Sequence, residues 1–324
     1  MKITDIEIRM CRHKNTGMKD SEMRDGKKSD LEFLVITFHT DEGLSSSTFG
    51  FAGRGAAMAG EIANSIFKPF FLGRDPLYRE KHWHEYRTAD RWWNHAPIYS
   101  YGPFDINCWL LSSMKAEQPL YKYLGAYRDS VPIYGSSLVL STPEAYAKEA
   151  LEYKDKGFNA YKLHPPGNYD FDLEAHKAVR KAVGNDFKLM SDPVAPYTFE
   201  QALRFGRELE KLNYYWYEEP LFDENFHNLR ELTRILDIPI VGTEVLAKHP
   251  YSVAECISTR VVDVVRADPS WSGGITATMK TAHLAESFGV SCEIHTAIYH
   301  PLELVNLHCC AAIKNCEFFE VLLP

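Results

Sequence analysis

The alternation of polar and apolar residues in the first part of the chain is typical of an antiparallel sheet. Apolar side chains recur at alternating positions along residues 1–10, and a β-branched and aromatic run follows at Leu34–Phe38. Asp41–Gly43, directly after this run, has the composition of a hairpin turn that leads into a further strand. We therefore predict an antiparallel meander, followed by helices near residues 56–68, 76–86 and 102–123.

Two segments of this first part have an unusual composition. Residues 13–29 are polar, contain glycine and carry many charges, so we interpret them as a loop. Residues 87–101 combine Arg87 and Arg91 with several aromatic residues, among them Trp92. So many aromatic side chains in a turn segment indicate a surface that covers a binding site.

From Val131 onward the pattern changes to short apolar strands separated by helix signals. Thr142, followed by proline, and Thr198 are typical of helix starts. Alternating strands and helices predict a parallel sheet with right-handed crossovers, and eight strands close a barrel. The predicted strands are residues 132–139, 159–163, 187–191, 214–217, 239–243, 261–266, 289–294 and 317–322. We therefore predict a TIM-type (β/α) barrel over residues 126–324, with an α+β capping domain formed by residues 1–125.

Six chemically reactive residues each close one of these apolar runs, about one strand-plus-helix unit apart. In a parallel barrel the C-terminal ends of all strands meet at one rim, where active sites lie. We expect the six side chains to converge on one site. They are Lys162, Asp192, Glu218, Glu244, Asp268 and His295.

Three of the six are acids at the ends of successive strands, namely Asp192, Glu218 and Glu244. Taken alone, each of these acids could equally be a helix N-cap or an exposed acid with no metal to bind. Together they would form an all-carboxylate cluster, and close carboxylates repel one another unless a cation lies among them. Ligation by oxygen atoms alone suits Mg²⁺, so we predict a magnesium site at this rim.

The remaining reactive residues are candidates for acid/base chemistry. Lys162 and His164 are two positions apart and should point to the same side, although a loop lysine and a turn histidine before Pro165 would have the same spacing. His295 ends a strand whose neighbour ends in Asp268, and a carboxylate beside an imidazole fixes its tautomer and raises its basicity. We interpret the two pairs as the two faces of one acid/base site.

The composition limits the classes of binding partner and the cellular compartment that we expect for this protein. The 324 residues carry a formal net charge of −8, which argues against nucleic acid as a partner because phosphate binding needs clustered lysine and arginine. The seven cysteines are an odd number with no C-x-x-C pair, which favours reduced thiols and argues against a zinc site. No apolar stretch reaches roughly 18 residues, so no membrane span is expected. We predict a cytoplasmic protein that acts on a small molecule.

Short motifs surround the six residues: KLH, SDP, YEEP, GTE, AD followed by a Gly-Gly helix start, and EIHT. Over the whole chain this set resembles the mandelate racemase-like branch of the enolase superfamily, of the acid-sugar dehydratase type. Sites of this superfamily use a lysine or histidine base with Mg²⁺ that stabilises an ene-diolate. The resemblance implies that the three acids hold Mg²⁺, that Lys162 or His164 and the Asp268–His295 pair move protons, and that Glu320 meets the substrate carboxylate.

The chain departs from the family pattern in three places. His164 stands where the second lysine of a Lys-x-Lys pair is common, so either Lys162 or His164 is open as the base. Val194 stands two positions after Asp192, where relatives often have asparagine. The chain also ends soon after the eighth strand, so we expect a C-terminal segment that relatives carry to be missing.

The chemistry that suits this set is removal of a proton α to a carboxylate, with Mg²⁺ taking up the charge that develops. We predict dehydration of a sugar acid, an aldonate or an aldarate, to a 2-keto-3-deoxy acid. His13, Arg87, Arg91 and Trp92, from the two unusual segments, are the predicted substrate contacts. A racemase, an epimerase or a sugar-lactone cycloisomerase would use the same residues, and a non-catalytic binding protein is the alternative from another class. We also expect a homo-oligomer.

Overall fold

The structure is a computed structural model, and it describes residues 1–14, 30–51, 55–93, 96–245, 248–296 and 300–322. Contacts between Cα atoms divide the chain into two compact units. Unit 1 comprises Met1–Ala126, Asp268–Lys280 and Tyr299–Ala312, and unit 2 comprises Tyr127–Ala267, Thr281–Ile298 and Ile313–Pro324. The two-domain division at residue 126 expected above stays a prediction.

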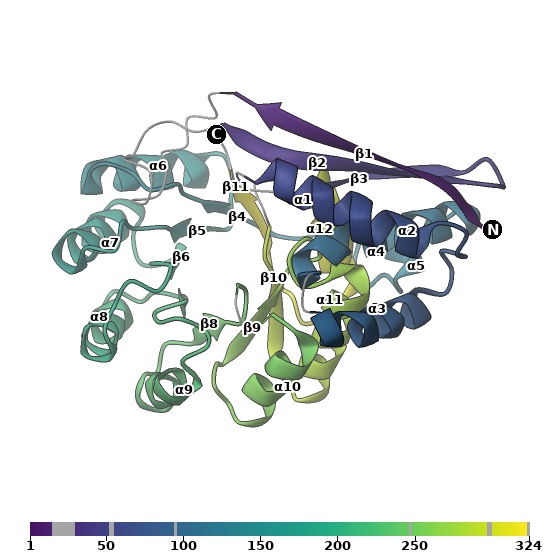
Figure 1. Cartoon of the computed structure of the whole chain (residues 1–324). Helices are drawn as coiled ribbons and strands as arrows, with labels where there is room; N and C mark the ends of the chain where they lie inside the picture. The colour runs from purple at the N-terminus through teal and green to yellow at the C-terminus, as the bar shows by residue number, and fades with distance from the viewer. Residues whose placement is uncertain (15–29, 52–54, 94–95, 246–247, 297–299, 323–324) are drawn as a thin grey trace. The chain divides into compact units, whose positions relative to one another are not determined.

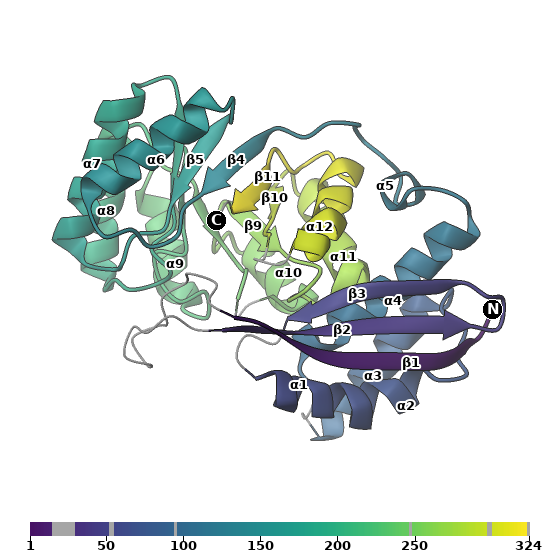
Figure 2. The ribbon, with the colours of Figure 1, turned by 90° about the horizontal axis from the view of Figure 1, so that it is seen from above.

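Unit 1 contains the three-stranded antiparallel sheet that the alternating pattern predicted. Its strands are β1 (Ile3–His13), β2 (Leu31–Thr40) and β3 (Ser45–Phe51), with β2 in the centre. Hydrogen bonds between Thr40 and Leu44 close the turn between β2 and β3, and Gly43 adopts a φ of 80° in this turn, which glycine tolerates. Figure 2 shows the three strands side by side.

Aromatic rings from the sheet and the helices form the core of unit 1. The helices before the barrel are α1 (Ala56–Ile62), a π-helical turn (Ala63–Phe67), α2 (Lys68–Phe71), α3 (Arg79–Trp93), α4 (Ile98–Lys115) and α5 (Leu120–Tyr123). Phe104 on α4 lies at the centre of this core, with its ring centroid 5.1 to 5.8 Å from those of Phe38, Phe67 and Phe71. All four side chains are buried, so the core joins β2 to three helical segments.

The prediction of a turn segment from residue 87 onward in unit 1 is wrong. Residues 87–93 belong to α3, so Arg87, Arg91 and Trp92 lie on a helix and not in a loop. The physical reason is that neither glycine nor proline interrupts the chain from the start of α3 to Pro97, which is the N-cap of α4. Aromatic content alone does not end a helix.

Unit 2 contains a parallel sheet of eight strands in the order β10-β9-β8-β7-β6-β5-β4-β11. The strands are β4 (Ile133–Ser136), β5 (Ala160–Leu163), β6 (Lys188–Ser191), β7 (Trp216–Glu218), β8 (Ile240–Gly242), β9 (Val264–Ala267), β10 (Ser291–Ile294) and β11 (Phe319–Leu322). Because β11 returns to pair with β4, the sheet forms a nearly closed barrel. The barrel prediction is confirmed, with strands shorter than predicted.

Helices follow the strands in the order that a (β/α) barrel requires. They are α6 (Pro143–Asp155), α7 (Tyr169–Val183), α8 (Phe199–Lys211), α9 (Phe226–Ile235), α10 (Pro250–Ser258), α11 (Gly274–Ser287) and α12 (His300–Ala312). Figure 1 shows α6 to α9 outside the strands. Thr142 caps α6, and Thr198 caps α8 in a capping box with Gln201, so both predicted helix starts are confirmed. None of the described helices is both long and apolar enough to cross a membrane.

The end strands β10 and β11 are linked by the side chain of Glu293 on β10. Its carboxylate accepts the backbone N–H of Glu317 at 2.8 Å and that of Phe318 at 3.2 Å. The N–H of Cys292 also donates to the carbonyl of Asn315 at 2.7 Å. Burial raises the pKa of Glu293, against the lowering effect of the two N–H donors. A buried carboxylate thus holds the seam between these two strands.

A buried histidine supports the strand end that carries the first acid. His176 on α7 is fully buried; its Nδ1 lies 2.6 Å from the carbonyl oxygen of Asp172, and its Nε2 lies 2.8 Å from Oγ of Ser191. Nδ1–H can donate to the carbonyl while Nε2 accepts from the hydroxyl, so this arrangement suits the neutral ring. Ser191 is the residue directly before Asp192, and His176 therefore ties α7 to the end of β6.

This histidine predicts a pH-dependent stability. Burial lowers the pKa of His176 to about 4, whereas an unfolded histidine titrates near 6.5. Between these values the unfolded chain binds more protons, so the free energy of unfolding should fall as the pH drops from about 6.5 to about 4. For one group the loss is about 3 kcal/mol. In His176→Gln, whose amide does not titrate, urea unfolding across this range should show a smaller pH dependence than in the wild type. Equal slopes would contradict the assignment.

Candidate functional site

Charged side chains gather at the C-terminal ends of the barrel strands in unit 2. They are Lys162 on β5, Asp192 after β6, Glu218 on β7, Glu244 after β8, Arg266 on β9 and Glu320 on β11. None of these residues is more than 6% exposed. Charged groups are almost never buried so deeply unless they are paired. We call the four carboxylates, Asp192, Glu218, Glu244 and Glu320, the acid cluster.

Lys162 is the first fixed cation of the acid cluster. Its Nζ lies 3.1 Å from Asp192 Oδ2, 3.2 Å from Glu218 Oε2 and 2.9 Å from Glu320 Oε1. Burial by itself would lower the pKa of Lys162, but the surrounding carboxylates raise it well above its usual value. The ammonium group therefore stays charged and binds three strands together.

Arg266 is the second fixed cation, and the sequence analysis missed it. Its Nε lies 2.8 Å from Glu218 Oε1 and donates to Glu244 Oε2 at 3.2 Å. Its Nη2 donates to Glu320 Oε2 at 2.7 Å, and its Nη1 donates to the hydroxyl of Tyr134 at 3.2 Å. The signal was present, because an arginine inside the apolar run of β9 needs buried acidic partners.

His164 lies next to Lys162 and also faces Asp192. Its Nε2 is 2.9 Å from Asp192 Oδ2, and its Nδ1 is 2.7 Å from the carbonyl oxygen of Ser137. The carbonyl can only accept, so Nδ1 carries a proton and Nε2 is the nitrogen on the acid cluster. Burial opposes its charge, but Asp192 raises the pKa of His164 above its usual value. Its side chain is 23% exposed, in contrast to that of Lys162.

His295 and Asp268 directly follow Ile294 and Ala267, which pair in register on β10 and β9. His295 Nε2 lies 3.3 Å from Glu244 Oε1, at the other end of the acid cluster from His164. Asp268 is fully buried, and its Oδ1 accepts the N–H and the hydroxyl of Ser270, both at 2.7 Å. The proton-transfer pair that these two residues were expected to form stays a prediction.

A further buried carboxylate lies beside the acid cluster and was not predicted. Glu219 follows Glu218 directly and is 7% exposed. Burial raises its pKa well above the usual value, and the carboxylates of Glu244, Asp192 and Asp223 raise it further. Glu219 is the second acid of the YEEP motif, but the spacing of the motif does not predict the direction of its side chain.

The acid cluster offers carboxylate oxygens, the type of donor that hard divalent cations prefer. Its four carboxylates meet two fixed cations, Lys162 and Arg266, which leaves a surplus of negative charge. Among the described residues, no donor is aligned with the buried Oε1 of Glu218 for a hydrogen bond. Burial raises the pKa of Glu218 to about 7 against the lowering effect of Arg266 and Lys162, and the nearby Asp192 and Glu244 raise it further. Oxygen ligands with uncompensated charge suit Mg²⁺.

In this structure the charged groups of Lys162 and Arg266 lie between the acids that were predicted to bind metal. Within the part of the chain that the structure describes, no three acidic, histidine or cysteine side chains form a group that could hold a metal ion. Oxygens of Asp192, Glu218 and Glu244 instead face Lys162 and Arg266. The donor set fits Mg²⁺ by its chemistry, and its role as the metal ligands stays a prediction.

The predicted substrate contacts His13, Arg87, Arg91 and Trp92 belong to unit 1, so their relation to the acid cluster stays a prediction. His13 is exposed at the end of β1, and Arg87 forms an ion pair of 3.5 Å with Asp90. The side chain of Trp92 lies outside the described residues. Glu320 lies in the acid cluster, where it pairs with both fixed cations.

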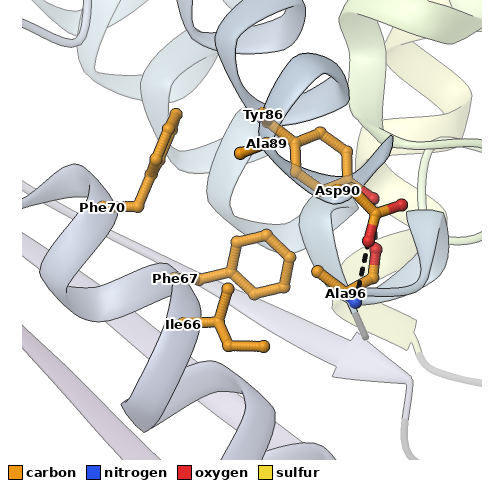
Figure 3. Close-up of a pocket in the computed structure, with 7 residues that line it drawn as sticks. All are labelled: Ile66, Phe67, Phe70, Tyr86, Ala89, Asp90 and Ala96. Atoms are coloured by element: carbon orange, nitrogen blue, oxygen red, sulfur yellow. Dashed lines mark hydrogen bonds between the residues drawn. The ribbon is translucent and has the colours of Figure 1, made fainter. Parts of the chain in front are cut away.

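A cavity of about 300 Å³ in unit 1 does not suit a sugar acid. Figure 3 shows its lining residues, which are Ile66, Phe67, Phe70, Tyr86, Ala89, Asp90 and Ala96. The single carboxylate, Asp90, accepts the N–H of Ala96, and Tyr86 donates to the carbonyl of the same residue. The other walls are apolar, and a polyhydroxylated anion would lose hydrogen bonds to water there.

Left-handed backbone occurs beside each of the three predicted metal ligands. Val194 and Ala195, after β6, have φ values of 59° and 56°, Glu219 after β7 has 38°, and Thr243 after β8 has 76°. The turn at Val194 is tied to the site, because its N–H donates to Asp192 Oδ1 at 3.2 Å. Side chains other than glycine, asparagine and aspartate rarely adopt this conformation, and such strain concentrates at functional sites.

These features together define a class of protein, a (β/α) barrel with buried carboxylates and acid/base groups at the C-terminal ends of its strands. The family described as "Enolase C-terminal domain-like" matches residues 145–324. The chain belongs to the enolase superfamily, in its mandelate racemase-like branch, and the predicted family is confirmed.

Relatives of known activity catalyse more than one type of reaction. Arabinonate dehydratase of Saccharolobus solfataricus is 30% identical over 82% of this chain and 74% of its own length. The crystal structure of D-glucarate dehydratase from Agrobacterium tumefaciens, complexed with magnesium, has a TM-score of 0.88 and 32% identity, and the match covers 100% of this chain and 87% of that one. N-succinyl-L-Arg/Lys racemase of Bacillus cereus is 27% identical over 84% of this chain and 74% of its own length. The family is one of enzymes, and its members include dehydratases and racemases.

The strain at Val194 predicts a stabilising substitution. A β-branched residue in left-handed backbone costs roughly 1–2 kcal/mol, and asparagine adopts this conformation more readily. Val194 is 58% exposed, so Val194→Asn loses little packing and should raise the free energy of unfolding by about 1 kcal/mol. Val139 is the matched control, because it is also 58% exposed and is not left-handed. The same change in stability for Val139→Asn in urea unfolding would show that strain is not the cause.

Proposed function

We propose that this protein is a Mg²⁺-dependent dehydratase of a sugar acid, an aldonate or an aldarate. The reaction removes the proton α to the carboxylate, gives an ene-diolate and expels the β-hydroxyl as water, and the enol then tautomerises to a 2-keto-3-deoxy acid. The observation that carries the proposal is the placement of His164 and His295 at two ends of one buried acid cluster, each through Nε2. Such a pair can take one proton and give another.

His164 is the proposed base of the first pair. The ammonium group of Lys162 is held by three carboxylates and has no exposed surface, so it keeps its proton. His164 is partly exposed, and its Nδ1–H on Ser137 leaves Nε2 as the atom that exchanges a proton. Asp192 raises the pKa of His164 against the effect of burial, so its base form becomes populated at a higher pH than that of an ordinary histidine.

His295 is the proposed general acid. It follows β10, which is five strands from β5 through β9 and three through the seam with β11, so it approaches the acid cluster from another side than His164. Its Nε2 faces Glu244, and a carboxylate beside an imidazole favours the protonated ring. A protonated Nε2 can give its proton to the departing hydroxyl. We propose that Asp268 orients this imidazole.

The acid cluster is proposed to hold the charge of the reaction. Mg²⁺ bound by Asp192, Glu218 and Glu244 would supply the positive charge that stabilises the carboxylate oxygens of the ene-diolate. Lys162 keeps a fixed positive charge among these acids. Because the cluster is buried, each of these interactions is stronger than it would be in water.

The remaining assignments complete the proposal. Glu320, His13, Arg87, Arg91 and Trp92 are proposed to contact the substrate. We also propose that the protein works in the cytoplasm as a homo-oligomer on a small sugar acid, with no nucleic acid or membrane partner.

Related reactions are the main alternative. A racemase, an epimerase or a sugar-lactone cycloisomerase would use the same two histidines and the same acids. Dehydration is favoured because arabinonate dehydratase and D-glucarate dehydratase are 30% and 32% identical to this chain, whereas N-succinyl-L-Arg/Lys racemase is 27% identical. A non-catalytic binding protein is disfavoured because both proton-transfer positions are occupied.

The first test combines substrate screening with metal binding. With Mg²⁺ present, a panel of aldonates and aldarates should include at least one that releases a keto acid, detected with semicarbazide. Glu244→Gln removes one ligand charge and should abolish this activity and weaken Mg²⁺ binding in calorimetry. A change in optical rotation without keto acid would identify a racemase instead. Wild-type protein that binds no Mg²⁺ would remove the proposal.

The two histidines can be separated by isotope exchange. If His164 removes the α-proton, His295→Asn should still exchange it with solvent deuterium, while dehydration falls by a factor on the order of 10² to 10⁴. His164→Asn should lose exchange and dehydration together. The opposite result would exchange the two roles, and full dehydratase activity in both variants would rule out the two-base mechanism. Proton NMR in deuterium oxide measures exchange and product formation in one sample.

A further inference from the structure

Arg266 contacts three of the four carboxylates in the acid cluster, as Lys162 does, but through a planar group with several N–H donors. Its guanidinium group reaches Glu218 on β7, Glu244 after β8 and Glu320 on β11, all from the interior of the barrel. We propose that Arg266 is a positioning residue that sets the orientation of Glu218 and Glu244 for a divalent cation. This inference rests on the proposed function, because it concerns the cation that the acid cluster would bind.

Arg266 meets a different oxygen in each of the two acids. Arg266 lies at Oε1 of Glu218, whereas Oε2 of Glu218 meets Lys162 and the indole N–H of Trp216. Arg266 binds Oε2 of Glu244, whose Oε1 faces His295. One oxygen of each carboxylate thus faces the same guanidinium, through an ion pair at Glu218 and a hydrogen bond at Glu244, and these contacts restrict rotation about the last side-chain bond of both acids.

The guanidinium is itself held in one orientation. Nη1 donates to the hydroxyl of Tyr134 on β4, and Nη2 donates to Glu320 on β11. The backbone N–H of Arg266 donates to the hydroxyl of Thr243, next to Glu244. Residues on or just after four strands, β4, β7, β8 and β11, therefore contact one rigid, planar group. Lysine would keep the charge, but a single ammonium cannot present the same fixed fork to separate carboxylates.

Arg180 provides a matched comparison inside the same barrel. It is also buried, at 6% exposure, but its hydrogen bonds go to the backbone carbonyls of Leu212, Gly184, Phe187 and Asn213. Its role is therefore to satisfy loop carbonyls, and it touches no carboxylate of the acid cluster. Replacement of Arg180 by lysine tests the loss of a buried guanidinium without any change at the site.

The decisive variant is Arg266→Lys, because it leaves the net charge unchanged. Calorimetric titration of the full chain with MgCl₂, without substrate, should give a Kd raised roughly 10- to 100-fold, as expected when the hydrogen bond that orients a metal ligand is lost. Arg180→Lys should lower the melting temperature but leave the Kd for Mg²⁺ at the wild-type value. Circular dichroism establishes that each variant is folded before the titration.

A milder variant covers the case in which Arg266→Lys does not fold. Tyr134→Phe removes only the hydroxyl that orients Nη1 and should raise the Kd for Mg²⁺ by a smaller factor, with the fold retained. A wild-type Kd in every folded variant at these two positions would overturn the inference and leave the proposed function standing. A wild-type protein that binds no Mg²⁺ would overturn both.

Discussion

The structure of the site depends on one constraint, the burial of four carboxylates in a space that holds two fixed cations. Asp192, Glu218, Glu244 and Glu320 would repel one another if they were left alone at this depth. Lys162 and Arg266 reduce this repulsion by pairing with acids on several strands at once. The remaining negative charge is the basis of the affinity for a further cation that we propose for the cluster.

The sequence predicted the parts of this arrangement that follow from spacing. Charged residues that end apolar runs at regular intervals indicated the barrel and the rim on which Lys162 and Asp192 lie. Arg266 was missed because it lies inside such a run, where periodicity indicates only a core position. The helix over residues 87–93 was missed because its aromatic residues were interpreted as a covering loop. Contacts such as that of His164 with Ser137 depend on loop geometry and have no signature in spacing.

The backbone at the strand ends shows how local conformation and chemistry are combined. The left-handed residues Val194, Glu219 and Thr243 each adjoin an acid-bearing strand. Such turns aim the N–H of Val194 at Asp192 and bring Thr243 Oγ1 within 3.1 Å of the carbonyl oxygen of Arg266. The conformational cost is local, whereas the resulting orientation affects a cluster shared by several strands.

The seam held by Glu293 is the junction between the two end strands of the sheet. Strands β4 to β10 form a continuous ladder of backbone hydrogen bonds, which includes the strands that carry or precede Asp192, Glu218 and Glu244, and β11 joins this ladder through β4 alone. Across the seam lies β11, which carries Glu320 and is held to β10 largely through one carboxylate. A breathing motion of the barrel would begin there. It would move Glu320 away from His295 and leave the three predicted metal ligands in register with one another.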